Sequence, residues 1–505
     1  MRLHEVRVWP PDAAWPRERQ LAWRIAEVAA ERVPPDEAVT DMVVNRMIDV
    51  AGVALAAIDR DPVASARAQA LCHPRAGGAT VLGMPSEQPV ACEWAAWANG
   101  AAVRELDFHD NFFAIESAHP GDTIPPLLAV AQQCGASGKD LVGAIATAYE
   151  IQIDLCKGIG LAVHGMDHVV HLGPAVAAGI GNLLRLSAPV IYQAVQHAAH
   201  VSLAVRQARR GQISSWKAHA PAHVGKLAIE AIDRAMRGET GPSPIYEGAY
   251  GIIARTLGGP DAVYQVPLPE PGEQRAAILE TFTKEHSAGY HGQALIDLAF
   301  RMRGRILEVI GDNWDTIERI VLHTKRIGHL VMGSGSGDPE KYDPVASRET
   351  LDHSAMFIFA VALQDGEWHH ERSYAPLRVR RPDTVRLWQK VRTVEDPEWN
   401  RRYDEPPPLG KDHGARAVIT LVGGARLIEE IAVADAHPRG ARPFGRSEYV
   451  GKFETLLESV VEPAERARFL ELVQRLPDLA PDELRSLTVE VQPSRRGDLD
   501  HRGIF

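Results

Sequence analysis

The first 240 residues constrain the fold most, because apolar residues recur there at helical spacing in one segment after another. Several of these segments are apolar on nearly all sides and dense in Ala and Gly, which is typical of helices inside a large bundle. Gly, Pro and Ser separate them. We therefore predict helices at residues 42–58, 93–107, 124–133, 138–159, 169–186, 188–205 and 218–237.

The pattern changes near residue 260, where short β-type runs replace the helical spacing. Strands are predicted at 317–324, 390–394, 416–422 and 426–433, and helices at 292–309 and 350–363. Gly423-Gly424 between the last two runs predicts a hairpin turn. Helical periodicity returns after residue 448.

We therefore expect a mostly α protein with an α+β second domain. A large all-helical domain, residues 1–280, is followed by a smaller α+β lid domain, residues 281–437. A C-terminal segment, residues 438–505, returns to the helical domain. The crevice between two such lobes is a common place for a small ligand.

Composition excludes several classes of partner. The net charge of −11 argues against nucleic acid, and no apolar run reaches the roughly 18 residues of a membrane span. The N-terminus does not resemble a signal peptide, so we expect a cytoplasmic protein. The chain has four cysteines, Cys72, Cys92, Cys134 and Cys156, and their spacings match no zinc or iron–sulfur pattern. The sequence also contains no dinucleotide fingerprint and no P-loop, so no cofactor is expected.

A polar stretch at residues 107–123 lies between two apolar helices. It contains Asp107 and Asn111, then His119 in the sequence His-Pro-Gly-Asp. As a purely structural element, it would be a loop that caps the helix beginning at Ile124. As a functional element, Asp107 would set the ionisation of His119, which is suited to proton transfer near neutral pH.

A second cluster, His164-Gly-Met-Asp-His168, places two histidines four positions apart. Gly165 stands where a zincin has its glutamate, and no third ligand follows at zincin spacing, so no metal is expected. His168 is then either a structural histidine or an acid–base group.

Cations concentrate in two further segments, although only ten of the 55 basic residues are lysine. The first could be an exposed basic turn or a clamp for carboxylates, and contains Arg206, Arg209 and Lys217. The second segment lies at the expected boundary between the lobes. It has four side chains that can take part in catalysis within eight positions, which is typical of catalytic loops: Lys284, His286, Tyr290 and His291.

These residues resemble the 2-methylcitrate dehydratase family (MmgE/PrpD superfamily), which includes cis-aconitate decarboxylase. The shared motifs run in the same order from about residue 40 to 480. They are DFHDN at 107–111, HPGD at 119–122, GMDHVV at 165–170, the lysine of SSWK, Lys284 with YHGQ at 290–293, and SRETLDHS at 347–354.

The resemblance implies a homodimer with a metal-free site between the two lobes. It implies polar site positions at Asp107, His119, His168, Lys217 and Lys284, with Asn111 where threonine is usual. Two departures are Ser287-Ala-Gly289, in place of a more usual Pro-Ala-(Glu or His), and Phe357, where tyrosine is common. No proton donor is therefore carried over to position 357.

For activity, the resemblance implies a hydro-lyase that converts 2-methylcitrate to 2-methyl-cis-aconitate in propionate catabolism. His119, held by Asp107, and His168 would transfer protons, while Lys217 and Lys284 would neutralise carboxylates. The side chains expected to bind substrate are Asn111, Arg206, Arg209, His286, Tyr290 and His291. The alternatives are a cis-aconitate decarboxylase, a dicarboxylate epimerase or isomerase, and a non-catalytic helical scaffold, for which these residues would lie scattered over exposed faces.

Overall fold

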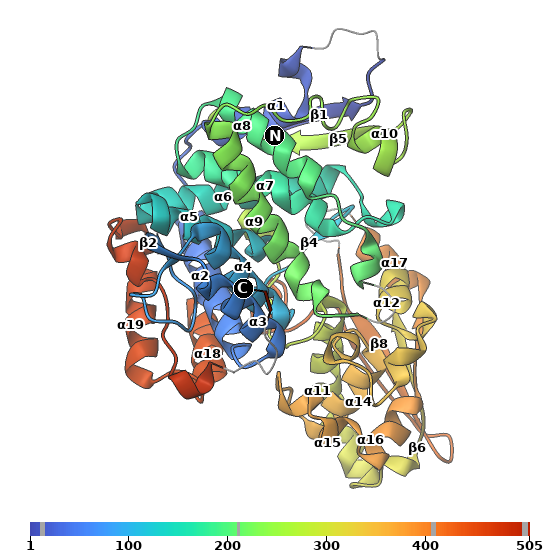
Figure 1. Ribbon diagram of the computed structural model, residues 1–505. Coiled ribbons are helices and arrows are strands. Elements are labelled where there is room, and N and C mark those ends of the chain that lie inside the picture. Colours follow the sequence, from blue (N-terminus) through green and yellow to red (C-terminus); the bar gives the residue numbers. More distant parts are fainter. Residues whose placement is uncertain (11–15, 210–212, 406–410, 497–502, 505) are drawn as a thin grey trace.

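Two buried apolar cores organise the chain in the computed structural model, which describes residues 1–10, 16–209, 213–405, 411–496 and 503–504. The larger core draws on residues between Val6 and Ile278, and again between Tyr449 and Val491. The smaller core draws on residues between Ala288 and Ala434. We call the part around the larger core the body and the part around the smaller core the lid (Figure 1).

The body is built mainly from helices, as its periodicity predicts. Neighbouring helices pack along their lengths, notably α4 on α9, α6 on α7 and α7 on α8. Gly100 in α4 permits the first of these contacts, since a Cβ there would lie 3.0 Å from the Cα of Ala222. The helices are α1 (Leu21–Ala30), α2 (Glu37–Ala56), α3 (Asp61–Leu71), α4 (Cys92–Glu105), α5 (Ile124–Cys134), α6 (Gly138–Gly158), α7 (Leu172–Leu183), α8 (Ala188–Val201), α9 (Trp216–Met236) and α10 (Ile252–Thr256).

The body is not all helical, in contrast to the expectation. β1 (Arg2–Arg7) pairs antiparallel with β5 (Val263–Leu268), and β3 (Phe112–Phe113) pairs with β4 (Ser117–Ala118). A further strand, β2 (Pro74–Ala79), precedes α4. The helix expected at 169–186 is also shorter, because residues 168–171 form a 3₁₀ turn before α7 begins.

The lid contains a four-stranded sheet in the order β7-β6-β8-β9, with β6 parallel to β7 and antiparallel to β8. The predicted hairpin joins β8 to β9, and Gly423 and Gly424 adopt the positive φ that its turn requires. The strands are β6 (Ile317–Thr324), β7 (Val391–Glu395), β8 (Ala415–Leu421) and β9 (Arg426–Ile431).

Two long helices of the lid, α11 and α14, pack on each other and against this sheet. The helix expected at 350–363 begins later, at Ala355, after a separate short helix. The lid helices are α11 (Tyr290–Ile310), α12 (Arg326–Val331), α13 (Arg348–Leu351), α14 (Ala355–Asp365), α15 (Pro376–Val379), α16 (Pro382–Gln389) and α17 (Pro397–Asp404).

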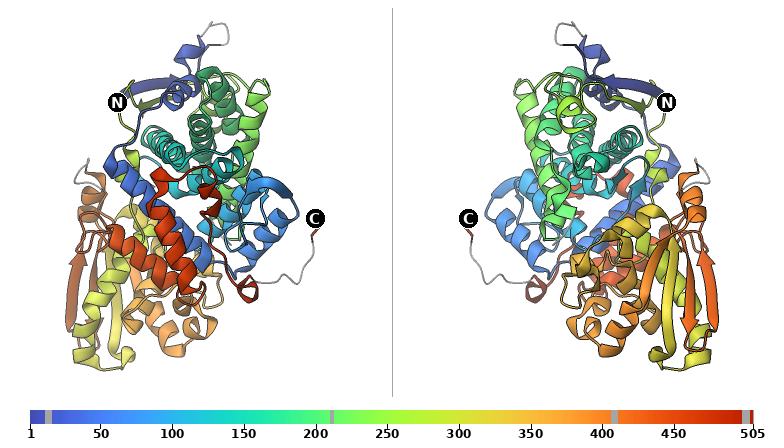
Figure 2. Two further views of the ribbon diagram at one scale, coloured as in Figure 1. Left: turned by 90° about the vertical axis from the view of Figure 1, so that its left-hand side faces the viewer. Right: turned by 90° about the vertical axis from the view of Figure 1, so that its right-hand side faces the viewer.

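After the lid, the chain returns to the body. α18 (Arg446–Leu457) and α19 (Pro463–Gln474) pack on α2, more than 380 residues earlier in the sequence (Figure 2). Because the chain leaves the larger core near residue 280 and rejoins it after Ala434, we propose domain boundaries near residues 280 and 437.

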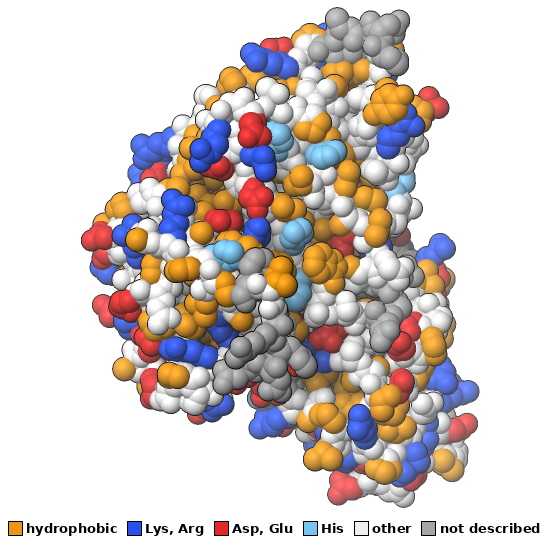
Figure 3. Space-filling view, in the orientation of Figure 1, with side chains coloured by type: hydrophobic (Ala, Val, Ile, Leu, Met, Phe, Trp, Pro, Cys, Tyr) orange, Lys and Arg blue, Asp and Glu red, His pale blue; other side chains and the backbone are white. Residues whose placement is uncertain are grey.

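Acidic and basic side chains are both spread over the face shown in Figure 3, which is hollowed between the body and the lid. Within the described part of the chain, none of the helices combines the length and apolar composition needed to cross a bilayer.

Candidate active site

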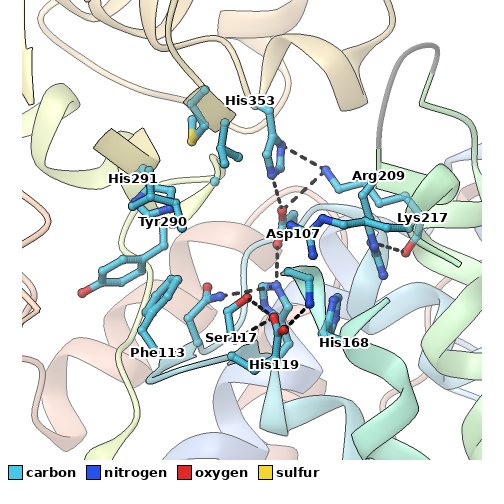
Figure 4. A pocket seen from close by; sticks show the side chains of 18 of the residues that line it. Asp107, Phe113, Ser117, His119, His168, Arg209, Lys217, Tyr290, His291 and His353 are labelled. Carbon is cyan, nitrogen blue, oxygen red and sulfur yellow. Dashed lines mark hydrogen bonds and ion pairs between the residues drawn. The ribbon is translucent and has the colours of Figure 1, made fainter. Parts of the chain in front are cut away.

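A cavity of about 180 Å³ lies where the body meets the lid (Figure 4). Ten of the eleven residues expected to form a site line this cavity: Asp107, Asn111, His119, His168, Arg206, Arg209, Lys217, Lys284, Tyr290 and His291. These positions span 185 residues of sequence, so the fold brings them together. A scaffold without a catalytic site would have left them scattered, and that alternative is not supported.

Asp107 is the centre of the cavity. It follows the end of α4 with a φ of +48°, in the left-handed region that non-glycine residues seldom adopt and that recurs at functional sites. Its carboxylate meets three cations: Arg104 one helical turn earlier, Lys284 Nζ at 2.6 Å and Lys217 Nζ at 3.5 Å. Burial disfavours ionisation, but these charges outweigh it and hold the pKa of Asp107 well below its usual range.

The two lysines approach Asp107 from different directions. Lys284, fully buried, donates to the carbonyl oxygen and to Oδ1 of Asp107, each at 2.6 Å. Burial lowers the pKa of Lys284 to about 8, and Asp107 opposes that shift only in part. Lys217, in the first turn of α9, also donates to Asp352 at 3.1 Å. Lys284 therefore carries a proton that it can release near neutral pH.

His119 is held by the backbone of Asp110. Its Nδ1 lies 2.9 Å from the Asp110 carbonyl oxygen, which can only accept, so Nδ1 carries the proton. Nε2 then accepts from Asn111 Nδ2 at 3.3 Å. Asp107 was expected to hold this ring, but its Oδ1 is 3.8 Å from Nε2. Burial, reinforced by Arg104 and Lys284, places the pKa of His119 well below its usual value, so the imidazole is neutral.

Close packing around the His-Pro-Gly-Asp motif explains why its third position is glycine. A Cβ on Gly121 would lie 2.8 Å from Asp110 Oδ1 and 2.8 Å from the His109 ring. Gly121 N also donates to Asp110 Oδ1 at 2.9 Å. Only glycine lets the loop come close enough to fix Asp110, whose carbonyl oxygen orients His119.

His168 presents the other imidazole of the body. Its Nδ1 lies 3.0 Å from Asp167, which Arg209 Nε contacts at 3.0 Å on its second oxygen. A carboxylate accepts hydrogen bonds, so Nδ1 carries the proton and Nε2 has the lone pair. Nε2 is buried and has no hydrogen-bond partner in the described chain. Burial lowers the pKa of His168 more than Asp167 raises it.

The balance of charge in the cavity favours an anion. Among its described lining residues, five carry a positive side chain and two a carboxylate. The cations are Arg104, Arg206, Arg209, Lys217 and Lys284, and the carboxylates are Asp107 and Glu116. Arg209 Nη2 is buried without a hydrogen-bond partner among the described residues, so a donor remains for a ligand. The acidic chain thus has a cationic cavity.

Sequence reasoning missed three residues at this centre: Arg104, Asp352 and His353. His353 lines the cavity with Nε2 3.5 Å from Asp107 Oδ2, and its Nδ1 contacts Asp352. Burial, with the nearby charge of Lys217, lowers the pKa of His353. The Asp-His pair of SRETLDHS was visible in the sequence, and Arg104 stands three positions before Asp107, within one helical turn.

His286 is the one expected site residue that does not line the cavity. Its Nε2 lies 2.9 Å from Asp297 Oδ1, and Asp297 Oδ2 accepts from the backbone of Asp435 at 2.8 Å. This contact ties the segment before α11 to the end of the lid sheet. His291, five positions later, does face the cavity, and its Nδ1 is 3.0 Å from Nδ1 of His413.

One group of side chains here could in principle hold a metal ion. Asp107, Asp352 and His353 offer ligand atoms within 4.8 Å of one another. Both carboxylates already pair with Lys217, and Asp107 also pairs with Arg104 and Lys284. A divalent cation would have to displace these ammonium and guanidinium groups, so this donor set fits an anionic ligand better than a metal.

Comparison with known proteins places both halves of the chain in one family. A family model described as the MmgE/PrpD N-terminal domain matches residues 19–265, and one described as the MmgE/PrpD C-terminal domain matches residues 286–478. The second match runs past the lid into the returning helices, so it does not follow the division between the two cores.

Named relatives are distant but cover most of the chain. A 2-methylcitrate dehydratase of Cupriavidus necator is 26% identical over 398 residues, which are 74% of this chain and 77% of the relative. The 2-methylcitrate dehydratase of Escherichia coli K12 is 25% identical over 75% of this chain and 78% of its own length. An alkylcitrate dehydratase of Talaromyces stipitatus is 23% identical over 74% and 76%.

The two family models together match well over half of the chain, which confirms the resemblance inferred from its motifs. Relatives named dehydratases occur in bacteria and in fungi. The chain therefore belongs to the MmgE/PrpD family and is a lyase of the hydro-lyase class.

Proposed function

We propose that this protein dehydrates 2-methylcitrate to 2-methyl-cis-aconitate. The observation that carries the proposal is the pairing, in one cationic cavity, of neutral imidazoles with a proton-bearing lysine. Dehydration next to a carboxylate needs a base for a carbon-bound proton, an acid for the leaving hydroxyl and positive charge for the carboxylates. His168, Lys284 and the arginines supply these three.

His168 Nε2 is the proposed base. It is neutral, carries its lone pair, and has no hydrogen-bond partner among the described residues that would compete with substrate. The electron pair released from the C–H bond moves toward the adjacent carboxylate, whose growing charge Lys217 and Arg209 stabilise. The ring centre of His119 lies 5.4 Å from that of His168, but its Nε2 already accepts a hydrogen bond from Asn111.

Lys284 is the proposed acid. Sequence reasoning assigned both proton transfers to histidines, but the pKa of each is lowered, and that of His119 far enough that it holds no second proton to give. Lys284 uses two of its N–H groups on Asp107 and has the third for the substrate hydroxyl. The C–O bond then breaks as the hydroxyl leaves as water and the C=C bond forms.

The direct test is incubation of the purified protein with 2-methylcitrate, citrate and cis-aconitate, with and without a chelator, followed by NMR. Loss of water from 2-methylcitrate, unaffected by the chelator, is the expected result. Release of carbon dioxide from cis-aconitate would instead identify a decarboxylase. Turnover of none of the three would overturn the tricarboxylate proposal.

The family supports three accompanying proposals: action in propionate catabolism in the cytoplasm, chemistry without a cofactor, and assembly as a homodimer. Sedimentation analysis tests the dimer, and full activity after exhaustive chelation tests independence from metal. A monomer, or activity restored only by an added metal ion, would contradict the respective proposal.

A further inference from the structure

His291 and His413 form a hydrogen-bonded pair at the cavity. Their Nδ1 atoms lie 3.0 Å apart, and His291 lines the cavity, whereas His413 is not among its lining residues. Figure 4 shows His291 beside Tyr290, on the opposite side of the pocket from Lys217. The proton transfers proposed above use neither of these two imidazoles.

His413 is fixed by the aromatic rings around it. It lies just before β8 and is only 3% exposed. Its ring centre is 4.4 Å from that of Phe113, 4.9 Å from that of Tyr290 and 5.2 Å from that of Tyr403. The last two rings meet it edge to face. A ring packed against three others does not turn freely, so His413 keeps its Nδ1 directed at His291.

Each ring of the pair carries one proton. Burial and, after it, the charge of Lys325 place the pKa of both His291 and His413 well below the usual value, so both imidazoles are neutral. A neutral imidazole has one N–H donor and one lone pair. The contact between the two Nδ1 atoms therefore joins a donor to an acceptor. Which ring donates decides whether Nε2 of His291 has a proton or a lone pair.

The surroundings of His413 Nε2 decide between these two arrangements. This atom is buried and has no hydrogen-bond partner among the described residues. If His413 accepted through Nδ1, its proton would be on Nε2 as a buried N–H without an acceptor, which folded proteins tolerate less than an unpaired lone pair. His413 therefore donates and His291 Nδ1 accepts. The proton of His291 is then on Nε2, the ring atom that remains for a ligand in the cavity.

We propose that His413 is a positioning residue, which keeps the proton of His291 on Nε2 so that this ring donates a hydrogen bond to a carboxylate of the substrate. The inference rests on the proposed function, because it takes the ligand to be a tricarboxylate. A carboxylate only accepts hydrogen bonds, so the opposite tautomer would set its lone pairs against that of Nε2. His291 thus serves a carboxylate other than the one beside Lys217 and Arg209, which lie across the pocket in Figure 4.

The tautomer of His291 is the first test, and it requires no substrate. In protein isotope-labelled at the nitrogens of its histidine rings, NMR distinguishes a protonated ring nitrogen from one with a lone pair. The signals of His291 are those missing from the His291→Gln variant. We expect the proton of His291 on Nε2 in the wild-type protein. A proton on Nδ1 would overturn the proposal.

Two variants of similar shape separate the hydrogen bond from packing. Leucine and asparagine both remove the ring of His413, but asparagine keeps an N–H at the place of Nδ1. His413→Leu should raise KM for 2-methylcitrate about tenfold and leave kcat within about threefold, because a hydrogen bond made equally to substrate and transition state acts on KM alone. His413→Asn should keep KM within about threefold of wild type. Equal KM values for the two variants would refute the role given to His413.

The outcomes separate this inference from the function on which it rests. If 2-methylcitrate is dehydrated but the proton of His291 is on Nδ1, or the two variants share one KM, the inference is wrong and the proposed function stands. If 2-methylcitrate is not dehydrated, the proposed function fails, and calorimetric titration with citrate replaces KM. Weaker binding of citrate to His413→Leu than to His413→Asn would then support the carboxylate contact. If citrate does not bind, or binds both variants alike, both proposals fail.

Discussion

Lys284 and Lys325 are both buried, but their ammonium groups differ in their hydrogen-bond partners. Both are essentially without solvent exposure, and burial lowers the pKa of Lys284 to about 8 and of Lys325 to about 7. Lys284 donates twice to Asp107. Lys325, at the end of β6 in the lid, has no hydrogen-bond partner for Nζ among the described residues and lies 5.8 Å from the centre of the Tyr403 ring.

The comparison shows what keeps a buried charge in place. An ammonium paired with a carboxylate stays available for chemistry, whereas one without a partner only lowers the free energy of unfolding. We therefore expect Lys284 to govern activity and Lys325 to govern stability. Variants of the two lysines and of Asp107 test this division.

Removing the carboxylate that supports Lys284 should have the largest effect. Asp107→Asn leaves Lys284 and Arg104 buried without their anion, and should lower the free energy of unfolding by about 3–5 kcal/mol. Urea denaturation measures it. Asp233→Asn is the control, because Asp233 pairs with the exposed Arg237 and the loss of this pair should cost at most about 1 kcal/mol. Equal costs for the two variants would refute the role given to Asp107.

Removing Lys284 itself should act on the reaction. Lys284→Met deletes the proposed acid, and kcat/KM for dehydration should fall on the order of 10²- to 10³-fold. Lys325→Met deletes an equally buried lysine outside the cavity lining and should keep kcat/KM within about threefold of wild type. A comparable loss in both variants would break the distinction between the two lysines.

Removing Lys325 should stabilise the lid. In the unfolded chain this lysine has its ordinary pKa of 10.5, and in the folded protein about 7, so between these values the unfolded state binds the extra proton. Its penalty grows as pH falls from 10.5 to 7 and is constant below. Lys325→Met should therefore raise the free energy of unfolding by about 4 kcal/mol at pH 7 and by nothing above pH 10.5. Denaturation at pH 7 and 10.5 measures the difference, and an unchanged stability at pH 7 would contradict it.

The pH dependence of activity should show the smallest effect. Lys284 must be protonated to act as the acid, so kcat/KM should fall about tenfold per pH unit above its pKa of about 8. Lys325→Met should leave this limb where it is, since Lys325 does not line the cavity. Activity that rises through pH 9 would exclude Lys284 as the acid.

Local signals in the sequence predicted much of the fold. α6 begins at Gly138 as expected, because Ser137 and Asp140 form a capping box, and β6 occupies the predicted range. The pairing of β1 with β5 escaped prediction. It joins residues about 260 positions apart, and β5 contains a proline, so neither strand has a local signal that identifies its partner.

The sequence predicted which residues line the cavity, but it did not predict which groups they hydrogen-bond to. Clusters of His, Lys and Asp identified the lining residues, but His119 is oriented by a backbone carbonyl, which no sequence motif displays. His286 and His291 are equivalent in the sequence, and the turn before α11 decides which of them faces the cavity. Both features depend on the local path of the backbone, which residue types alone do not specify.

Lys452, in the returning helix α18, connects parts of the chain that are synthesised at different times. Its Nζ donates to Asp49 Oδ1 at 2.7 Å and to the carbonyl oxygens of Phe108 and Lys284, each at 2.8 Å. One late residue thus joins an early body helix to the segments that carry Asp107 and Lys284. During synthesis, the segments that carry Asp107 and Lys284 therefore gain this connection to α2 only after Lys452 has emerged from the ribosome.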